Sequence, residues 1–424
     1  MFRRLAQCLR TLRPQSRKRL QVVCIVGTLW LNLLFFLDNV RGANRGTDFA
    51  VFYTAGLILR AGMGPQLYSN PLQFRLQEAF LGHLPFRQGP LPYIHPPFEA
   101  PIFVPLTYFS YAIAWWLWNA INLAILGAVI LLLRRYVSVL NKIAFWKLIL
   151  TLLAFFPIFA CLLEGQDSIL LLLFCSLAFC AMKRDSDVLA GCWLALGSFK
   201  FQFMIPILLF FLLWRRSRLL LGFVPVGVLL LGLSLLLVGT KTLLGYPWYA
   251  VHVVNQTRLG GVPLSLLPNL QGLVRGWPKP FSGVLGIVLA LSTSALLFAF
   301  GAWEGRPAKT WNNLELQFSL AVCIAVLIAW QTNIHDLSLL ILPIILIVEH
   351  LCREHEQESA VAVSLLLPVT PLLIGPLWIA LWLVIGQVNL IVIPMLWWIW
   401  EIAQHITRNS PNKPSVAIEC CEAR

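Results

Sequence analysis

Long apolar runs recur along almost the whole 424-residue chain, and short polar or basic tracts separate them. A helix that crosses a bilayer needs about 17 to 25 apolar residues, and several of the runs reach this length. Only 12% of the residues are charged, whereas soluble domains contain roughly 25%. The pattern predicts an all-α polytopic membrane protein. It excludes a soluble enzyme, a single-span receptor and an outer-membrane barrel, whose strands alternate in polarity over about ten residues.

Basic residues give the predicted spans their direction. The net charge is +14, but the basic residues lie mainly in short tracts between apolar runs, so nucleic-acid binding is not indicated. Seven basic residues and no acidic residue precede the first span. Because cytoplasmic segments are rich in Lys and Arg, the N-terminus is predicted to be cytoplasmic. The expected spans are 20–37, 108–133, 148–163, 168–182, 219–238, 284–302, 316–330, 337–351, 360–383 and 388–402.

Residues 188–214 allow two interpretations. Basic pairs flank the stretch, and Lys200 and Pro206 interrupt it. Two short helices that dip in and out would satisfy the charge pattern, and so would two thin crossings. Since each half is shorter than a span, the short helices are favoured, which gives ten crossings rather than twelve. The expected division is a basic cytoplasmic segment 1–19, a membrane domain 20–404 with outer loops 38–107 and 240–282, and a cytoplasmic tail 405–424.

Four polar groups, far apart in the sequence, fall on the outer face of this topology. They are Asp48, the tetrad 164–167, the loop 240–282 and the pair His335-Asp336. Ionisable groups at membrane depth are expensive and tend to be functional, so a shared site is predicted. The alternative is structural: Asp48 and Asp336 could cap helices, and His335 could be a wall residue. The seven histidines are scattered without ligand spacing, so no metal site is predicted.

The order of several motifs resembles glycosyltransferase family 87. The early outer loop contains GTDFAVFY (46–53), GPQLY (64–68) and YIHPPF (93–98), and GQDS (165–168), Ala190-Gly191 with Lys200, and IHDL (334–337) follow. The resemblance implies the C-type glycosyltransferase fold, with interfacial helices on a long first outer loop. It also implies inverting transfer of a sugar, mannose by analogy, from a polyprenyl-phosphate donor to a hydroxyl of a lipid or glycan acceptor. No cofactor is implied.

The same resemblance suggests roles for individual residues. Asp48 matches the general base, because a carboxylate can take the proton of the acceptor hydroxyl. His335 matches a second catalytic residue, which either grips phosphate or assists Asp48. The predicted substrate-binding residues are Arg45, Tyr53, Tyr93, His95, Gln166, Asp167, Arg258 and Asp336, and Arg275 and Lys241 are further candidates for the donor phosphate.

Other functions remain open at this point. A flippase or transporter of lipid-linked sugars would need buried charge along a path through the membrane, but the charges collect on one face and only Lys200 lies clearly within a span. A ligase that transfers whole polysaccharides would use the same kind of lipid carrier. A non-catalytic scaffold protein would not need Asp48. The resemblance implies a bacterial inner membrane, with the active site facing the exterior.

Overall fold

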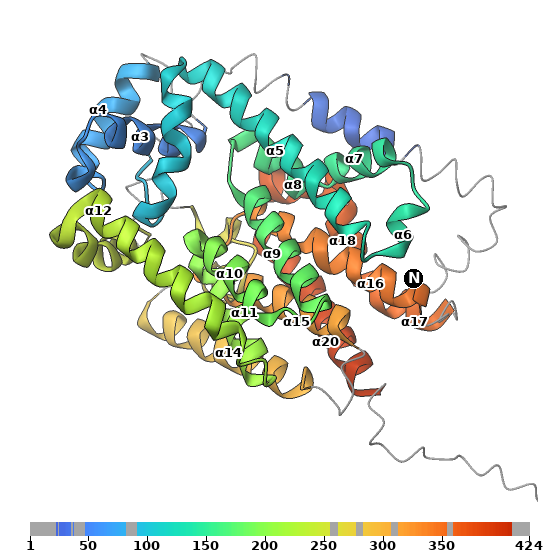
Figure 1. Ribbon diagram of the computed structural model, residues 1–424. Helices are drawn as coiled ribbons and strands as arrows, with labels where there is room; N and C mark the ends of the chain where they lie inside the picture. The colour runs from blue at the N-terminus through green and yellow to red at the C-terminus, as the bar shows by residue number, and fades with distance from the viewer. Residues whose placement is uncertain are drawn as a thin grey trace, which may run out of the picture.

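The computed structural model describes residues 23, 25–34, 37, 47–81, 91–254, 262–276, 283–306, 313–353 and 359–408. These residues form helices joined by turns and contain no strand, which confirms the predicted all-α class. Most of the helices form one bundle, and the helices of the early loop lie at one side of it, beside α12 (Leu219–Val254) (Figure 1).

Six stretches of the described chain are long and apolar enough to cross a membrane, or eight if each of two bent pairs forms one span. The six are α5 (Tyr111–Leu133), α10 with α11 (Asp187–Leu213), α12, α14 (Val284–Glu304), η7 with α16 (Ile334–Arg353), and η10 with α20 (Val388–Thr407). The bent pairs are α7 (Phe145–Ala154) with α8 (Phe156–Glu164), at 79°, and Val361–Leu373 with Gly375–Ile385, at 55°.

This number is lower than the ten or twelve crossings predicted from the sequence. Two predicted spans form helices that are shorter than the 18 residues required of a spanning helix here. They are α9 (Ser168–Lys183), with 16 residues, and α15 (Leu314–Ile328), with 15 residues. The predicted span 148–163 is sharply bent, because Phe155 interrupts the helix with an extended backbone. The first predicted span is described only in part, over Ile25–Leu34 and two flanking positions.

The segment from residue 240, which was predicted to be an outer loop, begins as helix. Helix α12 continues to Val254, with a kink at Gly239, whose φ of 77° lies in the left-handed region that favours glycine. Beyond the kink the helix reaches back to the early loop, where the Tyr246 hydroxyl donates to the carbonyl of Ile94 at 3.1 Å. The segment expected to be an outer loop therefore covers part of the early loop.

Residues 187–213 form a hairpin, although their length and composition alone would suit a single span. An ion pair of 2.7 Å joins Arg216, just after α11 (Phe201–Leu213), to Asp187 at the start of α10 (Asp187–Leu196). A straight helix of this length would place these ends about 40 Å apart. The chain turns back at Lys200, whose backbone is not helical. The interpretation as two short helices is therefore the one that the structure supports.

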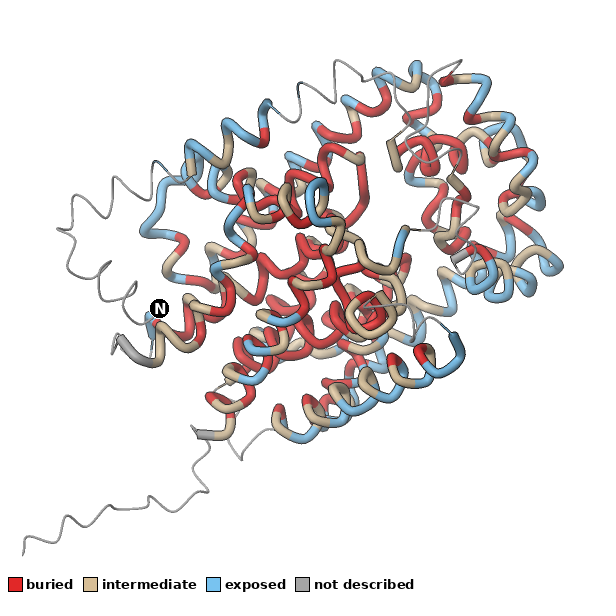
Figure 2. Tube along the Cα trace, turned by 180° about the vertical axis from the view of Figure 1, so that it is seen from behind, coloured by how far each residue is buried: buried red, intermediate tan, exposed pale blue. Residues whose placement is uncertain are grey.

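The buried core of the bundle surrounds α15. Every residue from Leu314 to Leu327 is buried, and Figure 2 shows the buried positions concentrated in the middle of the bundle. In contrast, α12 and α14 expose large apolar side chains, and Leu236 and Val284 are 85% and 78% exposed. Since exposed apolar stretches of this size are rare in soluble monomers, these helices have the surface of lipid-facing elements.

Helices of the early loop form a second, smaller core. They are α3 (Phe49–Arg60), α4 (Asn70–Leu81) and the 3₁₀ helix η2 (Pro97–Tyr108). Aromatic side chains join them: the rings of Phe52 and Phe103 stack at 4.7 Å, and Phe103 meets Trp118 of α5 edge-on. The sequence prediction of helices within the first outer loop agrees with this arrangement. The packing fixes the start of α3, where Asp48 lies.

Candidate active site

A polar cavity of about 140 Å³ lies where several segments of the chain meet, five of which contribute the polar residues considered first. Asp48 comes from the start of α3, His95 from the segment before η2, and Gln166 from the turn between α8 and α9. Lys200 comes from the turn of the α10–α11 hairpin, and His335 from the start of η7. The structure thus brings together residues up to 287 positions apart, in one cavity, as the predicted topology required.

Asp48 is held by Gln166 and does not cap its helix. Its side chain makes no capping hydrogen bond, and its Oδ2 accepts a hydrogen bond from Gln166 Nε2 at 2.7 Å. Gln166 is itself held in place, because its backbone carbonyl accepts a hydrogen bond from Asn122 Nδ2 at 3.1 Å. The capping role considered for Asp48 is therefore not the one its side chain plays, and the carboxylate is oriented beside the cavity.

Gly165 allows the close approach between Gln166 and Asp48. It ends α8 with a φ of 65°, a left-handed conformation that L side chains rarely adopt. A Cβ at this position would lie 2.7 Å from Cβ of Phe49 and 3.1 Å from the Trp115 ring. Only glycine lets the α8–α9 turn pack directly against the first turn of α3.

Lys200 connects three neighbouring side chains around a buried ammonium group. Its Nζ lies 2.6 Å from Asp167 Oδ1 and 2.6 Å from Asp336 Oδ1, and it donates to Ser168 Oγ at 2.7 Å. The ammonium group is therefore held by two ion pairs and by hydrogen bonds to Ser168 and Asp336. The lysine side chain is 4% exposed and Asp167 is fully buried, which makes correct pairing of the charges important for stability.

The pair His335-Asp336 lies at the start of η7 (Ile334–Leu340). Asp336 accepts from the backbone N–H of Asn333 at 2.8 Å, and the Asn333 side chain caps the helix in return. Asp336 is thus a helix-capping residue, as the structural alternative predicted, and also a partner of Lys200. His335 Nε2 is 3.7 Å from Asp336 Oδ1, which is too long for a strong hydrogen bond.

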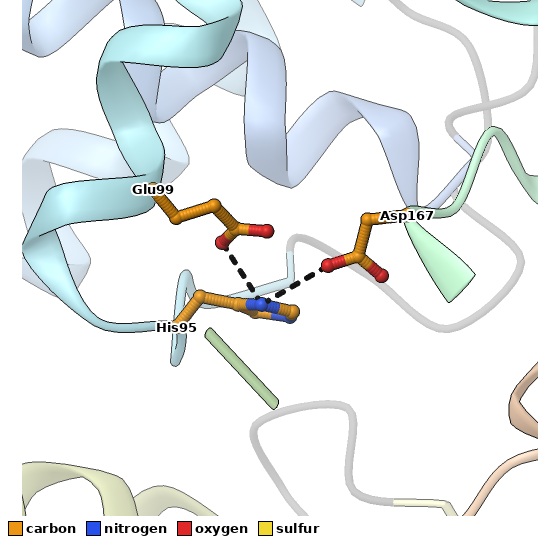
Figure 3. Close-up of side chains that lie close together, drawn as sticks. All are labelled: His95, Glu99 and Asp167. Atoms are coloured by element: carbon orange, nitrogen blue, oxygen red, sulfur yellow. Dashed lines mark ion pairs between the residues drawn. The ribbon is translucent and has the colours of Figure 1, made fainter. Parts of the chain in front are cut away.

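His95, Glu99 and Asp167 form a buried trio next to Lys200 (Figure 3). His95 Nδ1 lies 2.9 Å from Glu99 Oε2 and 3.5 Å from Asp167 Oδ2. Each of the three offers one atom that could bind a metal ion, and these atoms lie within 4.8 Å of one another. However, Lys200 already neutralises Asp167, so the trio fits a metal ion poorly.

The protonation of this trio follows from its burial and its charges. Burial raises the pKa of Glu99 to about 8, with Asp167 adding to the effect against the opposing influence of His95. Burial opposes the charged form of His95, but Glu99 and Asp167 outweigh it and raise the pKa of His95. Burial likewise opposes ionisation of Asp167, but Lys200 and His95 outweigh it and lower its pKa. At neutral pH Glu99 is therefore mainly protonated.

Several residues predicted to bind substrate have internal partners instead. The Tyr53 hydroxyl donates to the carbonyl of Phe109 at 2.8 Å, and the Tyr93 hydroxyl donates to Glu99 Oε2 at 3.1 Å. Like Asp167, neither tyrosine is among the residues that line the cavity. Arg45 and Arg258 lie outside the described residues. The further candidates Arg275 and Lys241 are described but do not line the cavity.

The cavity also contains residues that the sequence analysis did not assign to substrate. Gln202, Gln331 and Asn333 add carboxamide groups to its wall, and Lys200 supplies the ammonium. Lys200 carried a signal, as a charged residue within an apolar stretch that matched a family motif. The carboxamides carried none, because isolated Gln and Asn residues next to spans are common and only the fold shows which of them meet.

A second, apolar groove of about 290 Å³ adjoins the polar cavity. Phe199, Phe201, Val251 and Trp330 are among its lining residues. Four residues line both spaces: Ile94, His95, Gln202 and Gln331. The polar cavity and the apolar groove are therefore adjacent and share part of their walls.

Fold and site together define the class: a polytopic helical membrane protein with a polar, carboxylate-containing cavity beside an apolar groove. A family model for glycosyltransferase family 87 matches residues 93–330, more than half of the chain, and the chain belongs to this family. It is therefore a membrane glycosyltransferase. The comparisons find no similar curated protein and no similar solved structure. Asp48 and His335 lie outside the matched residues, so the family match does not assign their roles.

Proposed function

We propose that this glycosyltransferase moves a sugar, with inversion, from a polyprenyl-phosphate donor to a hydroxyl group of a lipid or glycan acceptor. The proposed sugar is mannose. The observation that carries the proposal is the position of Asp48: Gln166 orients its carboxylate beside a polar cavity that adjoins an apolar groove. The proposed chemistry uses no metal ion and no cofactor.

Asp48 is the proposed general base. An acceptor hydroxyl is a weak nucleophile, and a carboxylate within hydrogen-bond reach can remove its proton as the new bond to the anomeric carbon forms. The hydrogen bond from Gln166 uses one oxygen of Asp48 and leaves the other available. His335 lines the same cavity and is proposed to assist, either at Asp48 or at the substrate.

The shape of the site supports a lipid-linked donor. A polar head group fits the polar cavity, whereas an isoprenoid chain fits the adjoining apolar groove, and the phosphate that links them belongs at the junction. Gln202, Gln331 and Asn333 are proposed to bind sugar hydroxyl groups, since a carboxamide can both donate and accept hydrogen bonds. A water-soluble nucleotide sugar would leave the apolar groove without an occupant.

The location of the reaction is part of the proposal. Positive charge before the first span and after several others supports a cytoplasmic N-terminus and a site that faces the exterior of a bacterial inner membrane. We retain the division into a basic segment 1–19, a membrane domain 20–404 and a tail 405–424 as a proposal of the same kind.

A transfer assay tests this function. Membranes that contain the chain are incubated with radiolabelled polyprenyl-phosphate mannose, and the label is followed into lipid and glycan fractions, with the anomeric configuration of the product determined. Matched reactions contain GDP-mannose alone, under conditions in which no lipid donor forms. We expect transfer from the lipid donor only, with inverted configuration. Transfer from the nucleotide sugar, or movement of the lipid donor across the membrane without transfer, would contradict the proposal, the latter in favour of a flippase.

A further inference from the structure

We propose that His95 donates the hydrogen bond that holds the donor phosphate, at the junction between the polar cavity and the apolar groove. This inference rests on the proposed function, because it assumes a donor whose phosphate links a polar head to an apolar chain. It concerns a residue that the proposed mechanism has not yet used. Three features of the site support it: the cations of the cavity wall, the orientation of the His95 ring and the position of that ring.

Among the described residues, the cavity wall contains three side chains that can carry positive charge: Lys200, His95 and His335. Lys200 is the obvious partner for a phosphate, but its ammonium group already forms ion pairs with Asp167 and Asp336 and donates to Ser168. Binding a phosphate through Lys200 would therefore require one of these buried bonds to break. The two histidines are the remaining candidates.

The ring of His95 is fixed with one nitrogen inward. Nδ1 faces Glu99 Oε2 at 2.9 Å and Asp167 Oδ2 at 3.5 Å (Figure 3). The ring also meets Phe52 edge-on at 5.0 Å and lies over Tyr93 at 5.7 Å, which restricts its rotation. Asp167 stays ionised beside Nδ1 and favours the charged ring, in which Nε2 also carries a proton and can donate it to a ligand in a hydrogen bond.

The position of His95 separates it from His335. Of the two histidines, only His95 lines both the polar cavity and the apolar groove. His335 lies within the polar cavity, near Asp336. In a lipid-linked donor, the phosphate joins the sugar to the isoprenoid chain, so it must lie where the two spaces meet. That is where His95 presents its ring.

The proposed contact stabilises the charge that develops during transfer. The bond between the anomeric carbon and the phosphate oxygen breaks, and its electron pair leaves with that oxygen. The acceptor oxygen bonds to the anomeric carbon, and the acceptor proton passes to Asp48. The phosphate begins as a diester with one negative charge and leaves as a monoester with two, so a hydrogen bond from Nε2–H strengthens as the bond breaks. The histidine transfers no proton in this step.

Two substitutions separate this role from a structural one. In His95→Gln the amide nitrogen lies near the place of Nε2, whereas in His95→Asn it lies near the place of Nδ1. Binding of polyprenyl monophosphate, the leaving product, is measured on the purified full-length protein, with polyprenol as the control that lacks phosphate. We expect His95→Asn to weaken binding of the phosphate-bearing lipid by roughly tenfold or more, the scale of a lost hydrogen bond to a charged group, with polyprenol binding unchanged. His95→Gln should retain most of the affinity.

The opposite result would overturn the inference. If His95 only supports Glu99 and Asp167, His95→Asn should be the milder variant, or both variants should weaken the two lipids equally. Wild-type protein that binds polyprenyl monophosphate no better than polyprenol would also overturn it. The transfer activity of Asp48→Asn distinguishes the two proposals: a failure confined to His95 leaves an inactive Asp48→Asn enzyme, whereas failure of the proposed function leaves that variant active.

Discussion

Two ionic clusters lie at opposite ends of the same helices, and they are built differently. The site cluster contains His95, Glu99, Asp167, Lys200 and Asp336. The distal cluster contains Lys183, Glu315, Glu349 and Arg353. Helix α9 begins directly after Asp167 and ends at Lys183, so its 16 residues separate the clusters by about 24 Å.

The clusters differ in the exposure of their basic groups. In the distal cluster the carboxylates are buried, but the side chains of Arg353 and Lys183 are 47% and 21% exposed. In the site cluster, Lys200 is 4% exposed and both of its carboxylate partners are buried. A buried pair that loses one member leaves an uncompensated charge, whereas solvent screens a half-exposed pair. The comparison suggests that the distal cluster fastens helix ends, while the site cluster fixes geometry around the cavity.

Removal of the central ammonium should have the largest effect on stability. Lys200→Met leaves Asp167 and Asp336 without their shared partner, and we expect a loss of about 3 to 5 kcal/mol in the free energy of unfolding. Lys183→Met is the matched control at the distal end, where Glu315 keeps Arg353 as a partner at 2.9 Å, and should lose about 1 kcal/mol or less. Thermal unfolding of both variants in the same detergent checks this. Equal losses would remove the distinction between the clusters.

The turn that supports the site should be the next most sensitive feature. Gly165→Ala combines a left-handed backbone with a Cβ 2.7 Å from Phe49, so we expect a loss of roughly 1 to 3 kcal/mol and a clear fall in turnover. Gly62→Ala is the control, because Gly62 has a similar φ of 69° but open space around its Cβ position. The Gly62→Ala variant should lose only the stability that the strained backbone costs, and its turnover should stay at the wild-type level. Full turnover in both alanine variants would contradict the role of Gly165 in supporting the site.

The protonated Glu99 predicts a dependence of stability on pH. The pKa of Glu99 is raised to about 8 in the fold from about 4.3 in an unfolded chain. The native state therefore holds a proton that the unfolded state releases, and stability falls as the pH rises through 8. Between pH 7 and 9 the expected loss is about 1 kcal/mol. In Glu99→Gln this part of the pH dependence should be absent, with near wild-type stability at pH 7. An unchanged profile in the variant would show that Glu99 is ionised in the native protein.

Substitution of the most exposed member of the distal cluster should have the smallest effect. Arg353→Gln removes two ion pairs, but Glu315 keeps Lys183, and Glu349 keeps the backbone N–H of Val139 at 3.0 Å. We expect a loss below about 1 kcal/mol and unchanged transfer activity. A loss of activity in this variant would mean that the distal cluster also controls the site.

The convergence of Asp48, Gln166 and His335 could be predicted from the sequence, because basic tracts fix the direction of the spans and so decide which span ends share a face. The contacts between side chains on that face could not be predicted from the sequence. Lys200 was visible as a charge within an apolar stretch, but its partners are 32 to 136 positions away. Tyr93 stood in a family motif and was predicted to bind substrate, yet it points inward to Glu99. Spacing along an irregular segment does not show which way a side chain faces.

The described residues contain fewer long apolar helices than the crossings predicted from the sequence, for a related reason. Apolar character marks α9 and α15 as spans, but both are buried inside the bundle and are shorter than a lipid-facing helix needs to be. The bend between α7 and α8 and the continuation of α12 beyond Gly239 also depend on packing that no local pattern reveals.

The transfer activity of Asp48→Asn tests the central claim, that Asp48 is the base of a sugar transfer. Asparagine keeps the shape of the side chain and can still pair with Gln166, but it cannot accept the proton. We expect transfer from radiolabelled polyprenyl-phosphate mannose to fall by about 100- to 10,000-fold, while the thermal unfolding of the purified variant stays close to that of the wild type. Activity within about threefold of the wild type would contradict the claim and leave Asp48 with a structural role.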